Sequence, residues 1–352
     1  MIAADQPIQR PAAALLLVGD RNGQIHHWSR SEFVRLFSPG DLVIANDAAT
    51  MPASLAGTHG PTGRPIEVRL AGRDTLAQVT RFSGVLFGPG DFRTRTEDRP
   101  LPPAVHPGDQ LVLGPLRARI VGLHHHPRLV ALEFEGAPDT IWEGLARHGR
   151  PIQYSHLSTP LALWDTWTAI AAPPVAFEPP SAGFVLDWSS LAAMTKHGVQ
   201  FATITHAAGI SSTGDPELDR MLPFDEPYRI PASTAAAVRH ARQRGRRIIA
   251  IGTTVVRALE HSAAADGIVR SGEGLASQKI GPSTRLRVVD AILSGTHERG
   301  TSHYELLRAF ADDATLTLVE QALEAGGYRT HEFGDSVFLE ASRSLAVIRR
   351  AS

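Results

Sequence analysis

A short apolar strand that leads through a glycine into a helix is the feature that most constrains the fold of this chain. Residues 248–251 read Ile-Ile-Ala-Ile, Gly252 follows them, and residues 253–260 have the composition of a helix. Apolar, β-branched runs of this length are typical of strands buried on both faces, which occur in parallel sheets covered by helices. The segment therefore predicts an α/β domain.

Further helix and strand signals alternate along the second half of the chain, as they do in α/β proteins. Gly198 and Gly245 stand where two predicted helices would end, because glycine readily adopts the left-handed conformation common at helix C-termini. The predicted elements are a helix over residues 188–197, a strand over 199–206, a helix over 234–244 and a strand over 246–251.

Residues 63–136 follow a different pattern, with short alternating segments bounded by Gly, Pro or Asp. Strands are predicted there over residues 65–70, 76–82, 117–123 and 129–134. This is the pattern of a small antiparallel barrel or sandwich, inserted between an N-terminal set of strands and the α/β part.

Composition narrows the classes of function. The chain has 352 residues, which predicts two domains, and it contains no cysteine, which excludes disulfides, thiolate metal sites and cysteine nucleophiles. Its formal net charge of −1 gives no overall attraction to nucleic acid, although the arginines between residues 239 and 247 allow a local basic face. We find no signal-peptide pattern at the start and no apolar run as long as a membrane span. We therefore expect a cytoplasmic monomer with no membrane partner.

The turn at Gly252 also predicts a site for an anion. A glycine lets the backbone approach a ligand closely, and the unpaired N–H groups of a first helical turn attract negative charge. Thr253 and Thr254 add hydroxyl groups, and Arg257 follows about one helical turn later. The alternative is that a threonine only caps the helix and that Arg257 is a surface cation.

Residues 252–260 form the run Gly-Thr-Thr-x-x-Arg-x-Leu-Glu, and other distinctive runs lie at residues 36–42, 46–53, 180–183, 198–206, 289–297 and 333–335. In these runs and in their order, the chain resembles the S-adenosylmethionine:tRNA ribosyltransferase-isomerase family of queuosine biosynthesis. The resemblance implies an α/β main domain with an inserted small antiparallel β-barrel domain. We expect residues 1–58 and 151–352 to form the main domain and residues 59–150 to form the barrel.

The resemblance also implies a reaction. Members of this family transfer the ribosyl group of S-adenosylmethionine to a 7-aminomethyl-7-deazaguanine base of tRNA and isomerise it, which forms epoxyqueuosine and releases adenine and methionine. S-adenosylmethionine is then a co-substrate and tRNA a partner. No metal or redox cofactor is expected, because the sulfonium acidifies the neighbouring ribose carbon so that one base can start the rearrangement.

Proton transfer and charge stabilisation are assigned to three candidate catalytic residues, His297, Arg257 and Glu226. His297 lies in a Gly-rich loop after an apolar strand, where a histidine can exchange a proton near neutral pH. The alternatives are a solvated loop histidine at 297 and an ordinary loop carboxylate at 226. The candidate substrate-binding residues are Asn46, Asp47, Ser181, Gly183, His206, Gly252, Thr253, Thr254 and Asp335.

Two of these substrate-binding candidates have plainer structural alternatives. His206 ends an apolar strand and is about equally compatible with a hydrogen-bonded core histidine. Asp335 follows Gly334, and Gly-Asp is also common in turns. The tract His124 to His126 has the composition of a metal site, but it precedes Pro127 without a nearby carboxylate, so we expect a surface turn and no metal.

The chain also departs from the family pattern. Where the family has arginines in its Asn-Asp-Thr-Arg-Val-x-Pro-Ala-Arg-Leu segment, this chain has Ala49 and Ser54, so two cations that hold phosphate or carboxylate are missing. Two alternatives to the family reaction follow. The enzyme uses S-adenosylmethionine with a small-molecule acceptor, or the chain is a non-catalytic nucleoside- or RNA-binding protein on the same fold.

Overall fold

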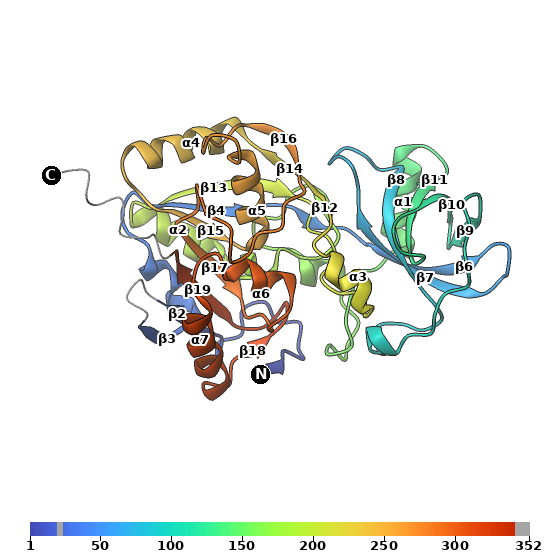
Figure 1. The fold of residues 1–352 in the computed structure, drawn as a ribbon, viewed down its shortest axis with the longest axis horizontal. Helices are drawn as coiled ribbons and strands as arrows, with labels where there is room; N and C mark the ends of the chain where they lie inside the picture. Colours follow the sequence, from blue (N-terminus) through green and yellow to red (C-terminus); the bar gives the residue numbers. More distant parts are fainter. Residues whose placement is uncertain (20–23, 342–352) are drawn as a thin grey trace.

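The computed structural model describes residues 1–19 and 24–341. It shows two units, an α/β main domain and a closed β-barrel, which lie side by side in Figure 1 with the barrel on the right. The fold predicted from the sequence is therefore confirmed.

The main domain is built on a mixed sheet of nine strands among the described residues. Its central strands β13, β4, β15 and β17 are parallel to one another, and their carboxyl ends meet at one edge. In sheet order the strands are β16 (Gly272–Ala276), β14 (Glu226–Ile230), β13 (Gln200–His206), β4 (Leu42–Asn46), β15 (Ile248–Ile251), β17 (Ala291–Gly295), β19 (Ser336–Glu340), β2 (Leu15–Gly19) and β3 (Ile25–Ser29).

Helices cover both faces of this sheet. Successive side chains of a strand point to opposite faces, so Leu42 and Ile44 pack into one core while Val43 and Ala45 pack into the other. The first core is closed by α4 (Ala232–Gln243), α5 (Thr253–Ser262), α6 (Ser302–Leu307) and α7 (Asp313–Ala325), and the second by α2 (Trp188–Lys196) and the 3-10 helices η1 (Arg30–Leu36) and η4 (Ser181–Val185). Among the described residues, we find no helix with the length and apolar character needed to cross a membrane.

The barrel is closed by antiparallel pairing of six strands. They are β6 (Ser54–His59), β7 (Pro65–Gly72), β8 (Arg81–Phe87), β9 (Gln110–Leu113), β10 (Leu116–Leu123) and β11 (Leu129–Phe134). Helix α1 (Pro138–His148) places Ile141 and Leu145 in the barrel core. The predicted boundary between residues 58 and 59 falls inside β6, so we propose that the inserted domain begins near Ser54.

The prediction of a strand over residues 76–82 was wrong, because β8 begins only at Arg81. The preceding loop is held by Arg73, whose guanidinium donates hydrogen bonds to the carbonyls of Leu76 and Gln78, each at 3.2 Å. It also donates to the carbonyl of Val175 in the main domain at 2.7 Å, so this loop is one of the links between the two units.

Smaller elements complete the junction of the two units. Helix α3 (Pro216–Met221) lies between them in Figure 1, and its Leu218 belongs to the barrel core. Strand β5 (Ala49–Thr50) pairs in parallel with β12 (Pro174–Ala176). The segment that leads into the barrel is therefore hydrogen-bonded to the segment that follows it. The remaining short elements are β1 (Ile2–Ala3), β18 (Arg329–Thr330), η2 (Thr96–Asp98) and η3 (Leu163–Thr166).

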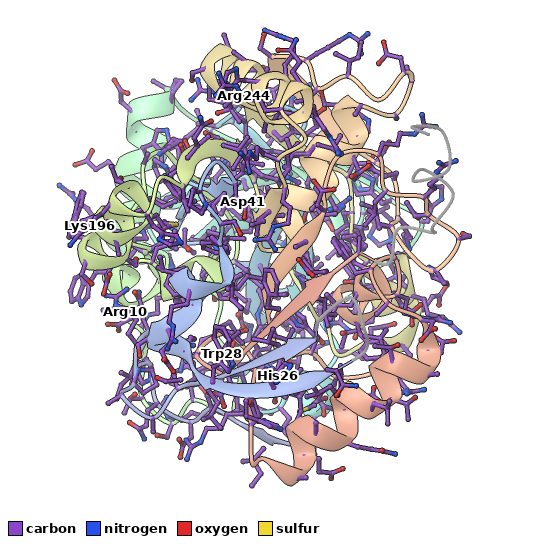
Figure 2. All side chains as sticks on the ribbon, turned by 90° about the vertical axis from the view of Figure 1, so that its left-hand side faces the viewer. Arg10, His26, Trp28, Asp41, Lys196 and Arg244 are labelled. Atoms are coloured by element: carbon purple, nitrogen blue, oxygen red, sulfur yellow. The ribbon has the colours of Figure 1, made fainter. Side chains whose placement is uncertain are left out.

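The basic run between residues 239 and 247 lies away from the barrel. Figure 2 views the main domain from the side opposite to the barrel and shows Arg244 at the upper rim of that side. Arg247 is already paired, since its guanidinium contacts Asp41 at 2.5 Å and Glu340 at 2.6 Å. Arg247 therefore stabilises the main domain through ion pairs.

Candidate active site at the carboxyl ends of the parallel strands

A cavity of about 430 Å³ opens where the carboxyl ends of β13, β15 and β17 meet. Its volume lies in the range of small-molecule sites, and this edge of a parallel sheet is where α/β proteins bind their ligands. The wall is formed by η4, by the segments that follow β13, β15 and β17, and by residues around α3 and α6.

The N-terminus of α5 forms one part of this wall. Gly252, Thr253 and Thr254 line the cavity, and Gly252 is the N-cap with φ of 94°. A side chain at this position would be strained and its Cβ would lie 3.3 Å from the Cβ of Ala182. No described side chain caps the helix, so the N–H groups of its first turn are available to an anion.

Arg257, Glu226 and His206 form a buried charged cluster beneath this helix end. Glu226 accepts hydrogen bonds from Arg257 Nη1 and from the backbone N–H of Gly209 at 2.6 Å, and its Oε2 lies 2.7 Å from His206 Nε2. Arg257 Nη2 also donates to the carbonyls of Ala276 at 2.7 Å and Phe224 at 3.2 Å. Arg257 and Glu226 both line the cavity, whereas His206 is fully buried behind them.

The surroundings of this cluster determine the charge of Glu226 and the exposure of Arg257. Burial alone would raise the pKa of Glu226, but the charge of Arg257 and the hydrogen bonds from His206 and Gly209 outweigh it and lower the pKa to about 2. Glu226 is therefore ionised at neutral pH, and its carboxylate is hydrogen-bonded to Arg257, Gly209 and His206. Arg257 is not a surface cation, because it is 4% exposed and most of its donors are occupied.

His297 also lines the cavity and is stacked on His303, with the ring centroids 4.8 Å apart. His297 Nε2 lies 2.9 Å from Ser294 Oγ. Burial and the neighbouring imidazoles of His303 and His331 hold the pKa of His297 well below its usual range, and burial lowers the pKa of His303 as well. Both imidazoles are therefore neutral near pH 7 and able to accept a proton.

Glu178 is a cavity residue that the sequence did not single out. It accepts a hydrogen bond from the Tyr154 hydroxyl at 2.5 Å. Burial, and next the charge of Glu332, raise its pKa to about 7 against the opposing hydrogen bonds from Tyr154 and Ser211. The signal in the sequence was a single carboxylate in the Pro-rich crossover before residue 181, where a charged residue among apolar ones indicates a special environment.

Asn46, Asp47 and Asp335, which we predicted to bind substrate, do not line the cavity. Asn46 Nδ2 donates to the His206 carbonyl at 2.9 Å and its Oδ1 accepts from the His206 N–H at 2.9 Å, so it joins the ends of β4 and β13. Asp47 accepts hydrogen bonds from the hydroxyls of Thr203 and Thr205. Asp335 accepts from the backbone N–H groups of Leu15 and Arg329 at 2.6 and 2.7 Å, so its carboxylate holds the fold together.

The two candidates in η4 have different positions. Ser181 lines the cavity and is partly exposed to it. Gly183 is buried behind it, where an added Cβ would lie 3.0 Å from Thr168 Cγ2, so this glycine serves close packing and not ligand contact. Two further cations that the sequence analysis did not select, Arg220 and Lys279, lie at the cavity wall.

The imidazoles of His124 to His126 point to separate partners. His124 Nε2 lies 3.2 Å from Ser83 Oγ, and His126 Nε2 lies 3.4 Å from Asp215 Oδ2, while His125 is exposed. Residues 125–128 form a turn, as predicted, but His126 is buried and does not lie on the surface.

Comparison with known proteins identifies the family. A family model described as queuosine biosynthesis protein matches residues 1–339. The S-adenosylmethionine:tRNA ribosyltransferase-isomerase of Sorangium cellulosum is 32% identical over 367 residues, covering 96% of this chain and 95% of the relative. The enzyme of the same name from Pelobacter propionicus is 29% identical over 347 residues, covering 97% of this chain and 96% of the relative.

A solved structure supports the fold. The S-adenosylmethionine tRNA ribosyltransferase of Thermotoga maritima has a TM-score of 0.50 and 22% identity, covering 96% of each chain. With the family model matching nearly the whole length and a relative above 30% identity, the chain belongs to the queuosine biosynthesis family of S-adenosylmethionine:tRNA ribosyltransferase-isomerases, as its motifs predicted.

Proposed function

We propose that this protein transfers the ribosyl group of S-adenosylmethionine to a 7-aminomethyl-7-deazaguanine base of tRNA and isomerises it to epoxyqueuosine, releasing adenine and methionine. The observation that carries the proposal is the cavity at the N-terminus of α5, which in a member of this family faces the neutral His297 and His303 pair. We further propose that the protein acts as a monomer in the cytoplasm, where a tRNA substrate is found.

His297 is the proposed general base. The sulfonium of S-adenosylmethionine acidifies the adjoining ribose carbon, so a neutral imidazole next to that carbon starts the rearrangement by taking its proton. The stack with His303 and the contact with Ser294 fix the ring, which leaves its Nδ1 for this proton. Because the sulfonium supplies the activation, the proposed chemistry uses no metal or redox cofactor in the cavity.

Glu178 is the proposed general acid. With a pKa of about 7 it is partly protonated at neutral pH, which is the condition for giving a proton to the departing adenine. It shares the cavity with His297, whose pKa is lowered so that its neutral form prevails at the same pH. Two groups whose surroundings set different protonation states are a usual basis for assigning acid and base.

The co-substrate is proposed to bind between η4 and α5. The first-turn N–H groups of α5, with Thr253 and Ser181, offer donors to the carboxylate of the methionine part. Arg257 and Glu226 position this end of the helix from beneath. Arg220 and Lys279 lie at the wall and are proposed to meet tRNA phosphates.

The test is mass spectrometry of adenine and methionine formed from S-adenosylmethionine, with and without tRNA that carries the aminomethyl deazaguanine base. We expect release that depends on this tRNA, a loss of at least about a hundredfold in His297→Gln and Glu178→Gln, and wild-type rates in His197→Ala, which lies outside the cavity. Full activity in both cavity variants would contradict the assigned roles.

A small-molecule acceptor is the second candidate, favoured by one observation. Ala49 is buried in β5 and the Ser54 hydroxyl is bonded to Glu67, so neither supplies the cation that the family pattern has there. Calorimetric binding of S-adenosylmethionine without tRNA-dependent release would favour this acceptor class. Absence of binding would favour the non-catalytic alternative.

A further inference from the structure

His156, His331 and Glu332 bring three potential metal ligands together outside the cavity wall described above. One donor atom from each lies within 4.8 Å of the other two. His156 belongs to the segment that returns from the barrel, whereas His331 and Glu332 lie between β18 and β19, near the end of the described chain. The cluster therefore exists only in the folded protein.

The distances suit a small divalent ion. Ligand atoms about 2.1 Å from a tetrahedral zinc ion are roughly 3.4 Å apart. His156 Nε2 and Glu332 Oε2 are already 3.2 Å apart, and the His156 and His331 rings are stacked with their centroids at 4.3 Å. To share one ion, the two imidazoles must rotate out of this stack, because the nitrogen lone pairs of stacked rings lie in nearly parallel planes.

The backbone conformation of His331 is constrained by the surrounding structure. His331 has φ of 70°, and among the described residues it alone adopts positive φ without being a glycine. Its carbonyl accepts a hydrogen bond from the Gly334 N–H at 2.9 Å, and Asp335 fixes both Leu15 and Arg329. Left-handed conformations of this kind cost free energy and persist where the surrounding structure imposes them.

A simple hydrogen bond accounts for His156 and Glu332 but not for His331. Within the described part of the chain, the His331 ring makes no hydrogen bond, and its contact is the stack on His156. The His156 ring also stacks with Tyr154, at 6.3 Å between centroids, and Tyr154 is itself fixed by Glu178. The His331 ring is exposed, and its nitrogens are open to a ligand.

We propose that His156, His331 and Glu332 form a binding site for a divalent transition metal such as Zn²⁺. Two imidazoles and a carboxylate are a donor set that such ions prefer, with water completing the coordination. The bound ion joins the segment leaving the barrel to the C-terminal part of the main sheet. Its expected role is structural, and the proposal does not depend on the proposed reaction.

The test is calorimetric titration of Zn²⁺ into the full chain after removal of metals by a chelator, with Co²⁺ absorption as a second readout. We expect one equivalent to bind and to raise the thermal midpoint. His156→Ala, His331→Asn and Glu332→Gln should each weaken binding at least about tenfold and remove the shift. The matched control is His125→Ala, which removes an exposed histidine of the 124–126 tract and should bind like the wild type.

His331→Asn removes the imidazole ligand without unfolding the protein, because asparagine tolerates positive φ. It should keep the wild-type thermal midpoint in chelator while losing the response to Zn²⁺. The proposal is overturned if the wild type binds no metal at millimolar Zn²⁺, if His331→Asn binds as well as the wild type, or if His125→Ala is the variant that loses the ion.

Discussion

At the scale of single residues, Arg257 and Glu226 form a buried ion pair in the cavity wall. Both side chains are nearly buried, and each also binds backbone groups or His206. A buried pair of this kind adds little net stability compared with an apolar replacement, but removal of one partner leaves an uncompensated buried charge. The pair therefore makes either residue alone difficult to replace.

Arg257→Ala is expected to lower the free energy of unfolding by about 3–5 kcal/mol, because the Glu226 carboxylate loses its counter-ion. Denaturant unfolding measures this change. The matched control is Arg35→Ala, whose partner Glu32 and own side chain are 41% and 73% exposed, and which should cost less than about 1 kcal/mol. The double variant Arg257→Ala with Glu226→Gln should be more stable than Arg257→Ala alone, and a further loss in the double variant would argue against this account.

Glu178 and Glu226, both in the cavity wall, are expected to give opposite pH dependence of stability. The pKa of Glu178 is raised from 4.5 to about 7, so its contribution to stability is complete below pH 4.5 and is lost as the pH rises through 7. Relative to the wild type, Glu178→Gln should therefore gain up to about 3 kcal/mol of stability as the pH rises from 4.5 to 7. Unfolding is measured in chelator, so that Glu332 carries no metal.

Glu226 supplies the comparison for this measurement. Its pKa is lowered to about 2, so its contribution is present above pH 4.5 and is lost as the pH falls through 2. Glu226→Gln should be less stable than the wild type above pH 4.5 and approach it in acid. Parallel pH curves for the two variants would contradict the assigned environments.

At the scale of elements, the start of α5 combines a backbone constraint with a place in the cavity wall. Gly252 has φ of 94°, lines the cavity and leaves little room for a side chain beside Ala182. Gly245 at the end of α4 also has positive φ, of 61°, but has nothing within 4 Å of an added Cβ. The same substitution at the two glycines therefore distinguishes the effect of backbone strain from the effect of crowding a ligand in the cavity.

Gly252→Ala is expected to cost about 1–3 kcal/mol of stability and to weaken S-adenosylmethionine binding at least about tenfold, because the methyl group displaces the helix end from the ligand. Gly245→Ala should cost about 1 kcal/mol and leave binding unchanged. Calorimetry and denaturant unfolding of both variants provide the measurement. Equal affinities in the two variants would show that the α5 turn does not contact the ligand.

At the scale of the whole molecule, the cavity and the basic run of α4 lie on different sides. The cavity opens at the strand ends that lead toward the barrel, whereas Arg244 lies on the side opposite to the barrel (Figures 1 and 2). A formal net charge of −1 gives no general attraction to RNA, so affinity for tRNA must come from local cations.

We expect Arg220→Ala and Lys279→Ala to weaken tRNA binding and to reduce the dependence of log K on log salt by about 1 for each phosphate that is no longer neutralised. The double variant Arg239→Ala, in α4, with Arg244→Ala, at its C-cap, is the control and should keep the wild-type slope. Filter binding across a range of salt concentrations distinguishes the two faces. A reduced slope in the α4 variant alone would place tRNA on the face away from the cavity.

The sequence by itself determined the class of fold, most of the elements and the family. Strand periodicity, helix-ending glycines and the Gly-Thr-Thr-x-x-Arg-x-Leu-Glu run are local patterns, and each depends on neighbours a few residues away. They placed β15, the α5 turn and the His297 loop at the site. These patterns wrongly predicted a strand before Arg81. Those residues form a loop instead, which is held by hydrogen bonds from Arg73.

Only the tertiary structure decided how polar residues are paired. Sheet order brings Glu226 to Arg257, and the resulting ion pair lowers the pKa of Glu226. The fold also buries Glu178, which raises its pKa to about 7. Asp335 accepts a hydrogen bond from the Leu15 N–H, far from it in sequence, and His156 meets His331 and Glu332 across the fold. Contacts between distant segments depend on strand order and register, which local sequence patterns do not specify.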